Sequence, residues 1–285
     1  MRGIYTVVAL LLLPLAAVPL AAGQVTLTGG VANVAPVVGV ASFGTSSYDP
    51  TANGNTAVAA SVAVVDTNGC SDVNGGSATV MASIVLATDS TQVLAGPTQM
   101  TAGSCTTGTS QAFTISLNMP YYAAATNYKV KVIATDRAAG ANTLVSAATF
   151  AYTTLTAMGS STPNGFSFGS AVAPGSSSPT GQSIAIYNGG NTQVDATLLG
   201  TELTLASPAA TIPVDAIKYS INSDMSSSGT MSGSSATLST FNLAAGNAAS
   251  KALYLQLVVP TPTTVGAYLP AGTYTGTVTV GVVAG

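Results

Sequence analysis

The sequence predicts an all-β fold, and three observations support this prediction. Apolar and polar residues alternate with a period of two in several runs, which is the period of a strand with one buried face. Clusters of Gly, Asn, Asp, Ser and Pro separate these runs at short intervals, as turns do. Past the N-terminal apolar run, no long stretch repeats with the 3.6-residue period of a helix.

Five runs show the alternation most clearly. In one of them, YKVKVIATD, Tyr128 and the valines that follow it are expected to face a core, while Lys129 and Lys131 face the solvent. The turn clusters between the runs include DPTANGNT, TNGCSDVNGG and PGSSSPTGQ. The alternating runs are 78–86, 128–136, 182–188, 251–257 and 273–283.

The chain opens with the features of a secretory signal peptide. One positive charge, Arg2, precedes an apolar run from Ile4 to about Leu20, which ends in small residues. We therefore expect residues 1–23 to be removed on export, with membrane contact limited to this signal, and the mature protein to be extracellular, at the cell surface. In the alternative, Arg2-Gly3 resembles the processing site of archaeal type IV pilins, which retain the apolar run as an assembly helix.

The domain organisation follows from a boundary in TAMGSSTPNG, where a strand-like run stops in small and turn-forming residues. We predict a first domain at about 37–157 and a second at about 162–285, after an N-terminal strand and tether at 24–36. Tyr128 and Tyr274 each open a late β-run, which is the position of the tyrosine corner in immunoglobulin-like (Ig-like) sandwiches. The prediction is therefore two tandem Ig-like β-sandwich domains.

The composition excludes several classes of function. Only 5% of residues are charged and the net charge is −3, so no basic surface for nucleic acid is expected. The chain has no histidine, which excludes Ser-His-Asp triads and His-based zinc sites. A hydrolase that uses carboxylates alone would need Glu202, the only glutamate, together with an aspartate such as Asp66. We expect Glu202 to be an exposed strand residue and the protein not to be an enzyme.

A resemblance to known surface proteins agrees with this prediction. The stretch FSFGSAVAPGSSSPTGQSIAIYNGGNTQVDATLLGTELTL and the terminal PAGTYTGTVTV resemble the Ig-like modules of archaeal and bacterial exported cell-surface proteins. In the first half, VVDTNGCSDVNGGSATVMASI and NYKVKVIATDRAAG resemble repeats of large archaeal surface proteins. The resemblance is one of turns and strands, and it implies a β-sandwich fold and a surface location, in a subunit of a filament or surface layer.

The stretch VVDTNGCSDVNGG contains the candidate site with the most polar side chains. Two cysteines in an exported chain predict one disulfide, Cys70 to Cys105, worth roughly 3–4 kcal/mol for a loop of this length. The loop then is a turn anchored by Cys70. In the alternative, carboxylate and amide oxygens at every second position bind one calcium ion, and no other cofactor is expected. The candidate calcium ligands are Asp66, Asn68, Asp72 and Asn74.

Two further loops are candidate sites. The stretch DRAAGAN, 136–142, predicts a hairpin loop with Asp136 and Arg137 in solvent, and a second ion site there is the alternative. Tyr121 and Tyr122 follow Pro120 and suit a sugar-stacking platform if both rings are exposed. The alternative is a split pair, with one ring packed and the other at the surface.

The N-terminal segment of the mature chain, QVTLTGGV, is the candidate assembly element. It alternates apolar and polar residues and is separated from the first domain by glycines and a proline, so it can be an ordinary first strand or can join the sheet of a neighbouring subunit. Our preferred hypothesis is a homopolymer built by such strand addition. The alternative is an adhesin that binds a cell-surface glycan or a partner cell. The assembly residues are Gln24, Val25, Thr26, Leu27, Thr28 and Val31.

Overall fold

The computed structural model describes most of the chain after the predicted signal. The predicted signal peptide, 1–23, and the assembly residues Gln24, Val25, Thr26 and Leu27 lie outside the described residues. Residues 28–32 belong to a unit separate from Asn33–Gly285 and have no regular secondary structure. None of the helical segments that the structure describes has the length and hydropathy of a membrane span. The described residues are 28–105, 108–160, 166–169, 171–180, 182–261 and 268–285.

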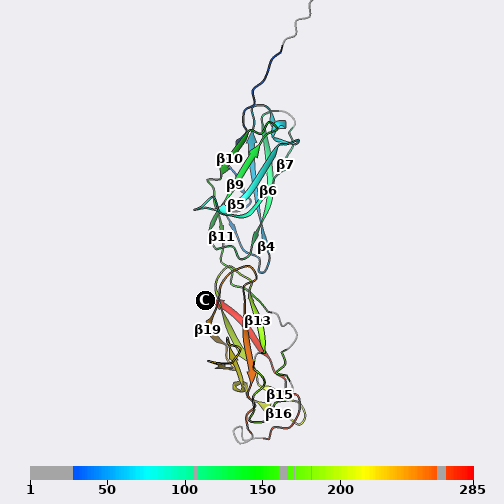
Figure 1. Cartoon of the computed structure of the whole chain (residues 1–285), viewed down its shortest axis with the longest axis vertical. Coiled ribbons are helices and arrows are strands. Elements are labelled where there is room, and N and C mark those ends of the chain that lie inside the picture. The colour runs from blue at the N-terminus through cyan, green and yellow to red at the C-terminus, as the bar shows by residue number, and fades with distance from the viewer. Residues whose placement is uncertain (1–27, 106–107, 161–165, 170, 181, 262–267) are drawn as a thin grey trace, which may run out of the picture. The chain divides into compact units, whose positions relative to one another are not determined.

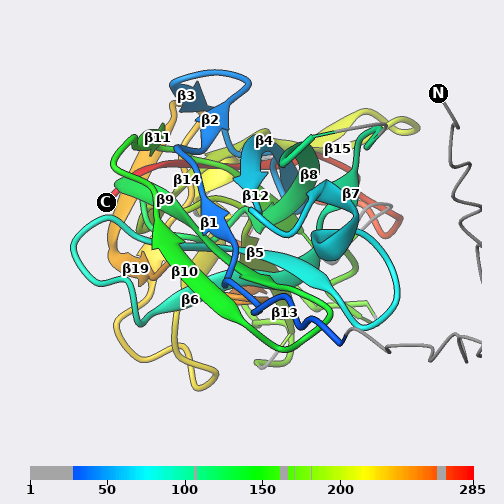
Figure 2. The same cartoon turned by 90° about the horizontal axis from the view of Figure 1, so that it is seen from above.

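Strands from residues 37–152 form two sheets. The first sheet has the order β1-β4-β8-β7, with β2 also paired to β4: β1 (Val37–Val38), β2 (Ser42–Phe43), β4 (Asn55–Val65), β7 (Thr101–Ala102) and β8 (Ser110–Pro120). The second has the order β3-β11-β9-β5-β6, with β10 also paired to β9: β3 (Ser47–Tyr48), β5 (Thr79–Leu86), β6 (Val93–Gln99), β9 (Asn127–Thr135), β10 (Ala141–Val145) and β11 (Phe150–Tyr152). β9 and β10 lie side by side, in green, in both Figure 1 and Figure 2.

The period-two pattern explains why these strands enclose a core. Along β4, Val58, Ala60, Val62 and Val64 are buried, while the residues between them are exposed or half-buried. β4 pairs with β8 over its whole length, so the buried residues of both strands lie on the same face. The valines of β9 and its Tyr128 supply the opposing layer of the same hydrophobic core.

Aromatic rings fill the centre of this first core. Phe150, on β11, is fully buried and lies edge-on to Phe43 and Tyr48, with ring centroids 5.1 and 5.3 Å away. Tyr128 lies opposite Phe150 in the β9–β11 pairing, with ring centroids 5.9 Å apart. Its hydroxyl donates to the carbonyl of Ala124 at 2.7 Å, four residues earlier, as in a tyrosine corner.

The buried phenol of Tyr128 should make stability fall at alkaline pH. Burial, with a smaller effect of neighbouring Tyr152, raises the pKa of Tyr128 to about 12. The folded state therefore favours the neutral phenol: this stabilisation is complete below about pH 10, the unfolded pKa, and is lost as the pH rises towards 12. We expect the loss to reach about 2–3 kcal/mol. Thermal unfolding from pH 9 to 12 measures it.

A matched pair of variants isolates this residue. Tyr128→Phe should reduce the slope of stability against pH, although it also removes the bond to Ala124. Tyr268→Phe, at a side chain that is 78% exposed, is the control for the loss of one phenol from the chain. Equal slopes for the wild type and Tyr128→Phe would contradict the prediction.

Strands from residues 158–284 form three further sheets. The largest has the order β12-β13-β20-β17-β18: β12 (Met158–Ser160), β13 (Ser183–Asn188), β17 (Ile217–Ser220), β18 (Gly229–Thr230) and β20 (Ser250–Leu257). A three-stranded sheet has the order β19-β14-β21: β14 (Val194–Gly200), β19 (Ala236–Leu243) and β21 (Val278–Ala284). A two-stranded sheet contains β15 (Leu203–Leu205) and β16 (Ala210–Ile212), and the two 3-10 helices of the described chain are η1 (Cys70–Val73) and η2 (Val214–Ala216).

These strands surround a second hydrophobic core. It includes Ile186 of β13, Leu198 of β14, Phe241 of β19 and Leu253 of β20. Tyr274 packs against this core, and its hydroxyl donates to the carbonyl of Pro270 at 3.0 Å, the same four-residue spacing as at Tyr128.

The prediction of an all-β fold is confirmed, with one strand displaced. Four of the five alternating runs correspond within a residue or two to β5, β9, β13 and β20. The last strand, β21, begins at Val278 instead of residue 273. Before it, Thr275 forms an isolated bridge with Thr204, so the alternating pattern there belongs to a connection that pairs at one residue.

Candidate functional site

The loop that follows β4 is a tight turn with a short helix. Asp66, the first residue after β4, is fully buried, and its Oδ1 accepts a hydrogen bond from the backbone N–H of Asn68 at 2.7 Å. This is the Asx-turn bond that Asp makes to its own backbone two residues on. η1 follows at once and carries Cys70 and Asp72. Gly75 and Gly76 end the loop with φ values of 92° and 62°, which glycine adopts without strain.

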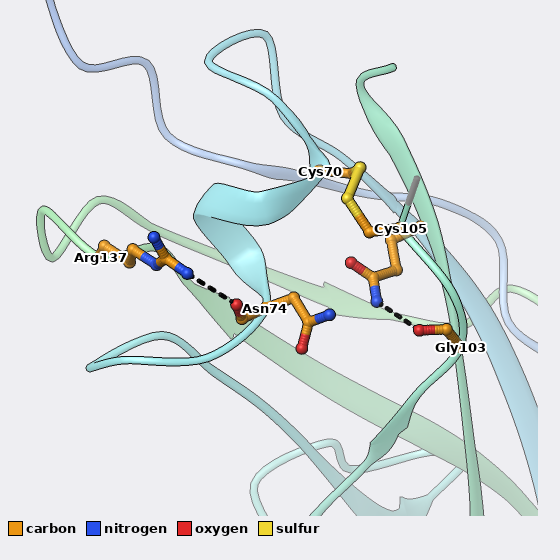
Figure 3. The surroundings of a disulfide bond; sticks show 6 residues. Cys70, Asn74, Gly103, Cys105 and Arg137 are labelled. Carbon is orange, nitrogen blue, oxygen red and sulfur yellow. Dashed lines mark hydrogen bonds between the residues drawn. A yellow bond between two sulfur atoms is a disulfide. The ribbon is translucent and has the colours of Figure 1, made fainter. Parts of the chain in front are cut away.

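The disulfide connects this loop to the segment before β8. Cys70 is buried and is bonded to Cys105, with their Cα atoms 5.8 Å apart, which is the pairing that the two-cysteine composition predicts. Figure 3 shows the bond beside η1 and also Arg137, whose guanidinium Nη2 donates to the carbonyl of Asn74 at 3.0 Å. The loop is therefore held on one side by the disulfide and on the other by a side chain of the β9–β10 hairpin.

Asp136, the first residue after β9, is buried, and this corrects the expectation that it is solvated. It is 1% exposed, whereas Arg137 is exposed as expected. Its Oδ1 accepts from the backbone N–H groups of Ala138 and Gly140, both at 2.8 Å, and its Oδ2 from the side-chain amide of Asn33 at 2.9 Å. The Asn33 bond and the two backbone donors hold the pKa of Asp136 below its usual value, against the opposing effect of burial. Because these donors satisfy both carboxylate oxygens, the charged form of Asp136 can be buried.

Three carboxylates meet where these loops converge. One oxygen each of Asp66, Asp72 and Asp136 lies within 4.8 Å of the others, and we call these residues the carboxylate cluster. Asp66 and Asp136 are buried and Asp72 is half-buried. Oδ2 of Asp66 has no hydrogen-bond partner among the described residues.

The cluster contains half of the calcium ligands that the sequence predicts. Asp66 and Asp72 belong to it, while Asn68 Oδ1 accepts from the backbone N–H of Val34 at 2.8 Å and Asn74 presents its carbonyl to Arg137. Sequence reasoning missed Asp136 as a partner of this loop and placed it at a separate site. The only sign in the sequence was that an aspartate opens the hairpin loop 136–142.

The remaining predicted site residues are Tyr121, Tyr122 and Glu202, and they do not belong to the carboxylate cluster. Tyr121 and Tyr122 are both half-buried, and their ring planes stand at 89° with centroids 5.2 Å apart, so they do not form one flat face. The hydroxyl of Tyr121 also accepts a hydrogen bond from the N–H of Ala248 at 3.3 Å. Glu202 is exposed, just before β15. A role for the tyrosines in sugar binding stays a prediction.

The described part of the N-terminal assembly segment forms no strand. Thr28 and Val31 are exposed, Val31 with 91% of its surface, and regular pairing starts only at β1. Whether the whole segment is an ordinary first strand or an assembly strand stays a prediction.

Comparisons with known proteins place the chain in no family. No family model matches it, and no curated protein is similar. Among solved structures, a chaperone–tip adhesin complex of CFA/I fimbriae is 12% identical and has a TM-score of 0.31, over 90% of this chain and 87% of that one.

Two further structures are similar at this level. The C-terminal domain of the Streptococcus pyogenes antigen I/II-family protein AspA is 10% identical, with a TM-score of 0.24 over 88% of this chain and 96% of that one. The secreted serine protease VesC of Vibrio cholerae is 13% identical, with a TM-score of 0.20 over 77% of this chain and 47% of that one. The neighbours thus include a chaperone–tip adhesin complex, an antigen I/II-family domain and a secreted serine protease, and function has to be argued from the chain itself.

Proposed function

We propose that the mature chain is a non-enzymatic extracellular subunit that polymerises into a filament or surface layer by strand addition. The observation that carries this proposal is the free edge of β21. This strand pairs with β14 along its whole length, from Val278 opposite Gly200 to Ala284 opposite Val194. In the part of the chain that the structure describes, no strand pairs with its other edge.

The free edge of β21 lacks the features that protect other edge strands. Natural edge strands are kept from pairing with other chains by charges, prolines and bulges. β6, another edge strand, has Pro97 and two register shifts against β5. The sequence of β21, VTVGVVA, has no charge and no proline, and Val283 is 38% exposed. The edge is therefore suited to accept a further strand.

A groove into the second core begins beside this strand. It has a volume of about 1040 Å³ and is lined by Val278 at the start of β21 and by core side chains such as Ile184, Ile217 and Leu257. A strand added there could place alternate apolar side chains against the core while its backbone pairs with the edge. Strand addition of this kind supplies hydrogen bonds and apolar contact together.

The N-terminal segment 24–31 supplies a strand of suitable sequence. Val25 and Leu27 alternate with Thr26 and Thr28, and the segment has no charged side chain. The donor segment 24–31 of one subunit would pair with the acceptor strand β21 of the next, so the two surfaces in contact differ. Such a heterologous contact produces an open polymer when the rotation between neighbouring subunits does not close a ring.

The test compares the polymers formed by the wild type with those formed by three variants. Deleting residues 24–31 removes the donor, and Thr279→Lys with Val283→Lys places two charges on exposed positions of the acceptor strand. Each should raise the critical concentration for assembly at least about tenfold, or about 1.4 kcal/mol per subunit contact. Thr240→Lys, at an exposed position of β19, is the matched control and should assemble as the wild type does.

Electron microscopy and sedimentation measure the assembly, and circular dichroism checks that each variant is folded. Unimpaired polymers of the deletion variant would rule out the donor role of 24–31. A wild type that stays monomeric at high concentration but binds a glycan array, with binding lost in Tyr121→Ala, would favour the adhesin alternative.

A further inference from the structure

The carboxylate cluster brings together three acidic residues from distant parts of the chain. Asp66 follows β4, Asp72 lies in η1 and Asp136 is the first residue of the loop between β9 and β10. The chain has only nine acidic residues, so three within 4.8 Å of one another are a marked concentration of negative charge. We propose that this cluster binds one calcium ion, which locks the two loops and the first residues of the folded unit together.

The burial of Asp66 points to a bound cation. Its Oδ1 has a donor in Asn68, but its Oδ2 is buried without a hydrogen-bond partner among the described residues. A buried carboxylate oxygen without a partner is costly, and two further carboxylates nearby add repulsion. Arg137, next to Asp136 in sequence, uses Nε and Nη2 on the carbonyls of Gly75 and Asn74. A cation between the carboxylates satisfies the free oxygen and removes the repulsion.

The geometry and chemistry of the cluster fit calcium. The three carboxylate oxygens are no more than 4.8 Å apart, so one point lies within about 2.8 Å of all of them. An ion at this point would be close to the usual Ca²⁺–oxygen distance of about 2.3–2.6 Å. Carboxylate oxygens are the ligands of hard cations, and the chain offers neither a histidine nor a free thiol for zinc. Mg²⁺ demands shorter bonds in a near-ideal octahedron, whereas Ca²⁺ accepts irregular sites completed by carbonyls and water.

The ion would stabilise the place where the folded unit begins. Asn33 donates to the Asp136 carboxylate, and the N–H of Val34 donates to the side chain of Asn68, whose own backbone is bonded to Asp66. Residues 33 and 34 therefore contact both loops of the cluster. With calcium bound, these contacts should become more rigid.

The test measures binding and stability in the full chain after removal of divalent ions. Isothermal titration with CaCl₂ should show one site, and saturating calcium should raise the midpoint of thermal unfolding (Tm) by about 5 °C or more. MgCl₂ at the same concentration should give a much smaller rise. A flat titration together with an unchanged Tm would overturn the proposal, and an equal response to Mg²⁺ would overturn the identity of the ion.

Matched variants locate the ion. Asp66→Asn should lower calcium affinity at least about tenfold, but its site is buried and the variant can lose stability for other reasons. Asp72→Asn, at a half-buried residue, tests the same site with less disturbance and should show the same loss. Asp215→Asn, at an exposed carboxylate outside the cluster, should bind as the wild type does. Wild-type affinity in Asp72→Asn and Asp66→Asn would place the ion elsewhere and overturn the proposal.

Discussion

Replacing Phe150 by alanine is expected to destabilise the first core by about 3–5 kcal/mol. The ring is fully buried and contacts three other aromatic rings, those of Phe43, Tyr48 and Tyr128. Truncation removes its apolar surface and its edge-to-face contacts, and it leaves a cavity that the two sheets cannot close without moving. Urea-induced unfolding followed by circular dichroism and tyrosine fluorescence measures the effect, since the chain has no tryptophan.

The control for Phe150→Ala is a similar change in the second core. Phe241 is also fully buried, among strands of the 158–284 sheets. Because the two hydrophobic cores contain different residues, Phe150→Ala and Phe241→Ala should shift different parts of the unfolding curve. A loss below about 1 kcal/mol for Phe150→Ala would show that the aromatic centre is far less tightly packed than its contacts indicate.

Removing the disulfide is expected to cost roughly 3–4 kcal/mol. Cys70 and Cys105 are 35 residues apart, and cross-linking them restricts the unfolded chain by about this amount in the chain-entropy estimate. The double variant Cys70→Ala/Cys105→Ala avoids a free thiol and should unfold at a lower urea concentration than the oxidised wild type. Its loop also carries Asp72, so we expect its calcium affinity to fall as well.

Reduction provides an independent check of the same bond. Dithiothreitol should lower the stability of the wild type to about that of the double variant and should leave the double variant unchanged. If the double variant were as stable as the oxidised wild type, the bond would make no net contribution.

Part of the candidate site was predictable from the sequence and part was not. The 66–74 loop was identifiable because its Asp and Asn residues lie at alternating positions within nine residues. The role of Asp136 was not, because it is 70 and 64 positions from Asp66 and Asp72 in the sequence. Its placement follows from the sheet order, which puts β9 next to β5 and brings the β9–β10 hairpin to the loop after β4.

The edge of β21 is a second feature that depended on the tertiary structure. Its alternating residues predict a strand, but the same pattern occurs in β20, which pairs on both sides, with β13 and β17. Whether a strand is central or at an edge depends on which other strands reach it, and a period of two in one strand carries no information about that.

The sequence by itself determined the all-β class, the single possible disulfide pair and the two tyrosines expected at tyrosine corners. Each of these depends on local periodicity, on a count or on short spacing. Only the tertiary structure decided that Asp136 is buried beside Asp66 and Asp72, and that β21 keeps one edge free in the described part of the chain. Both depend on pairing between strands that are far apart in sequence, which is chosen by the packing of whole sheets.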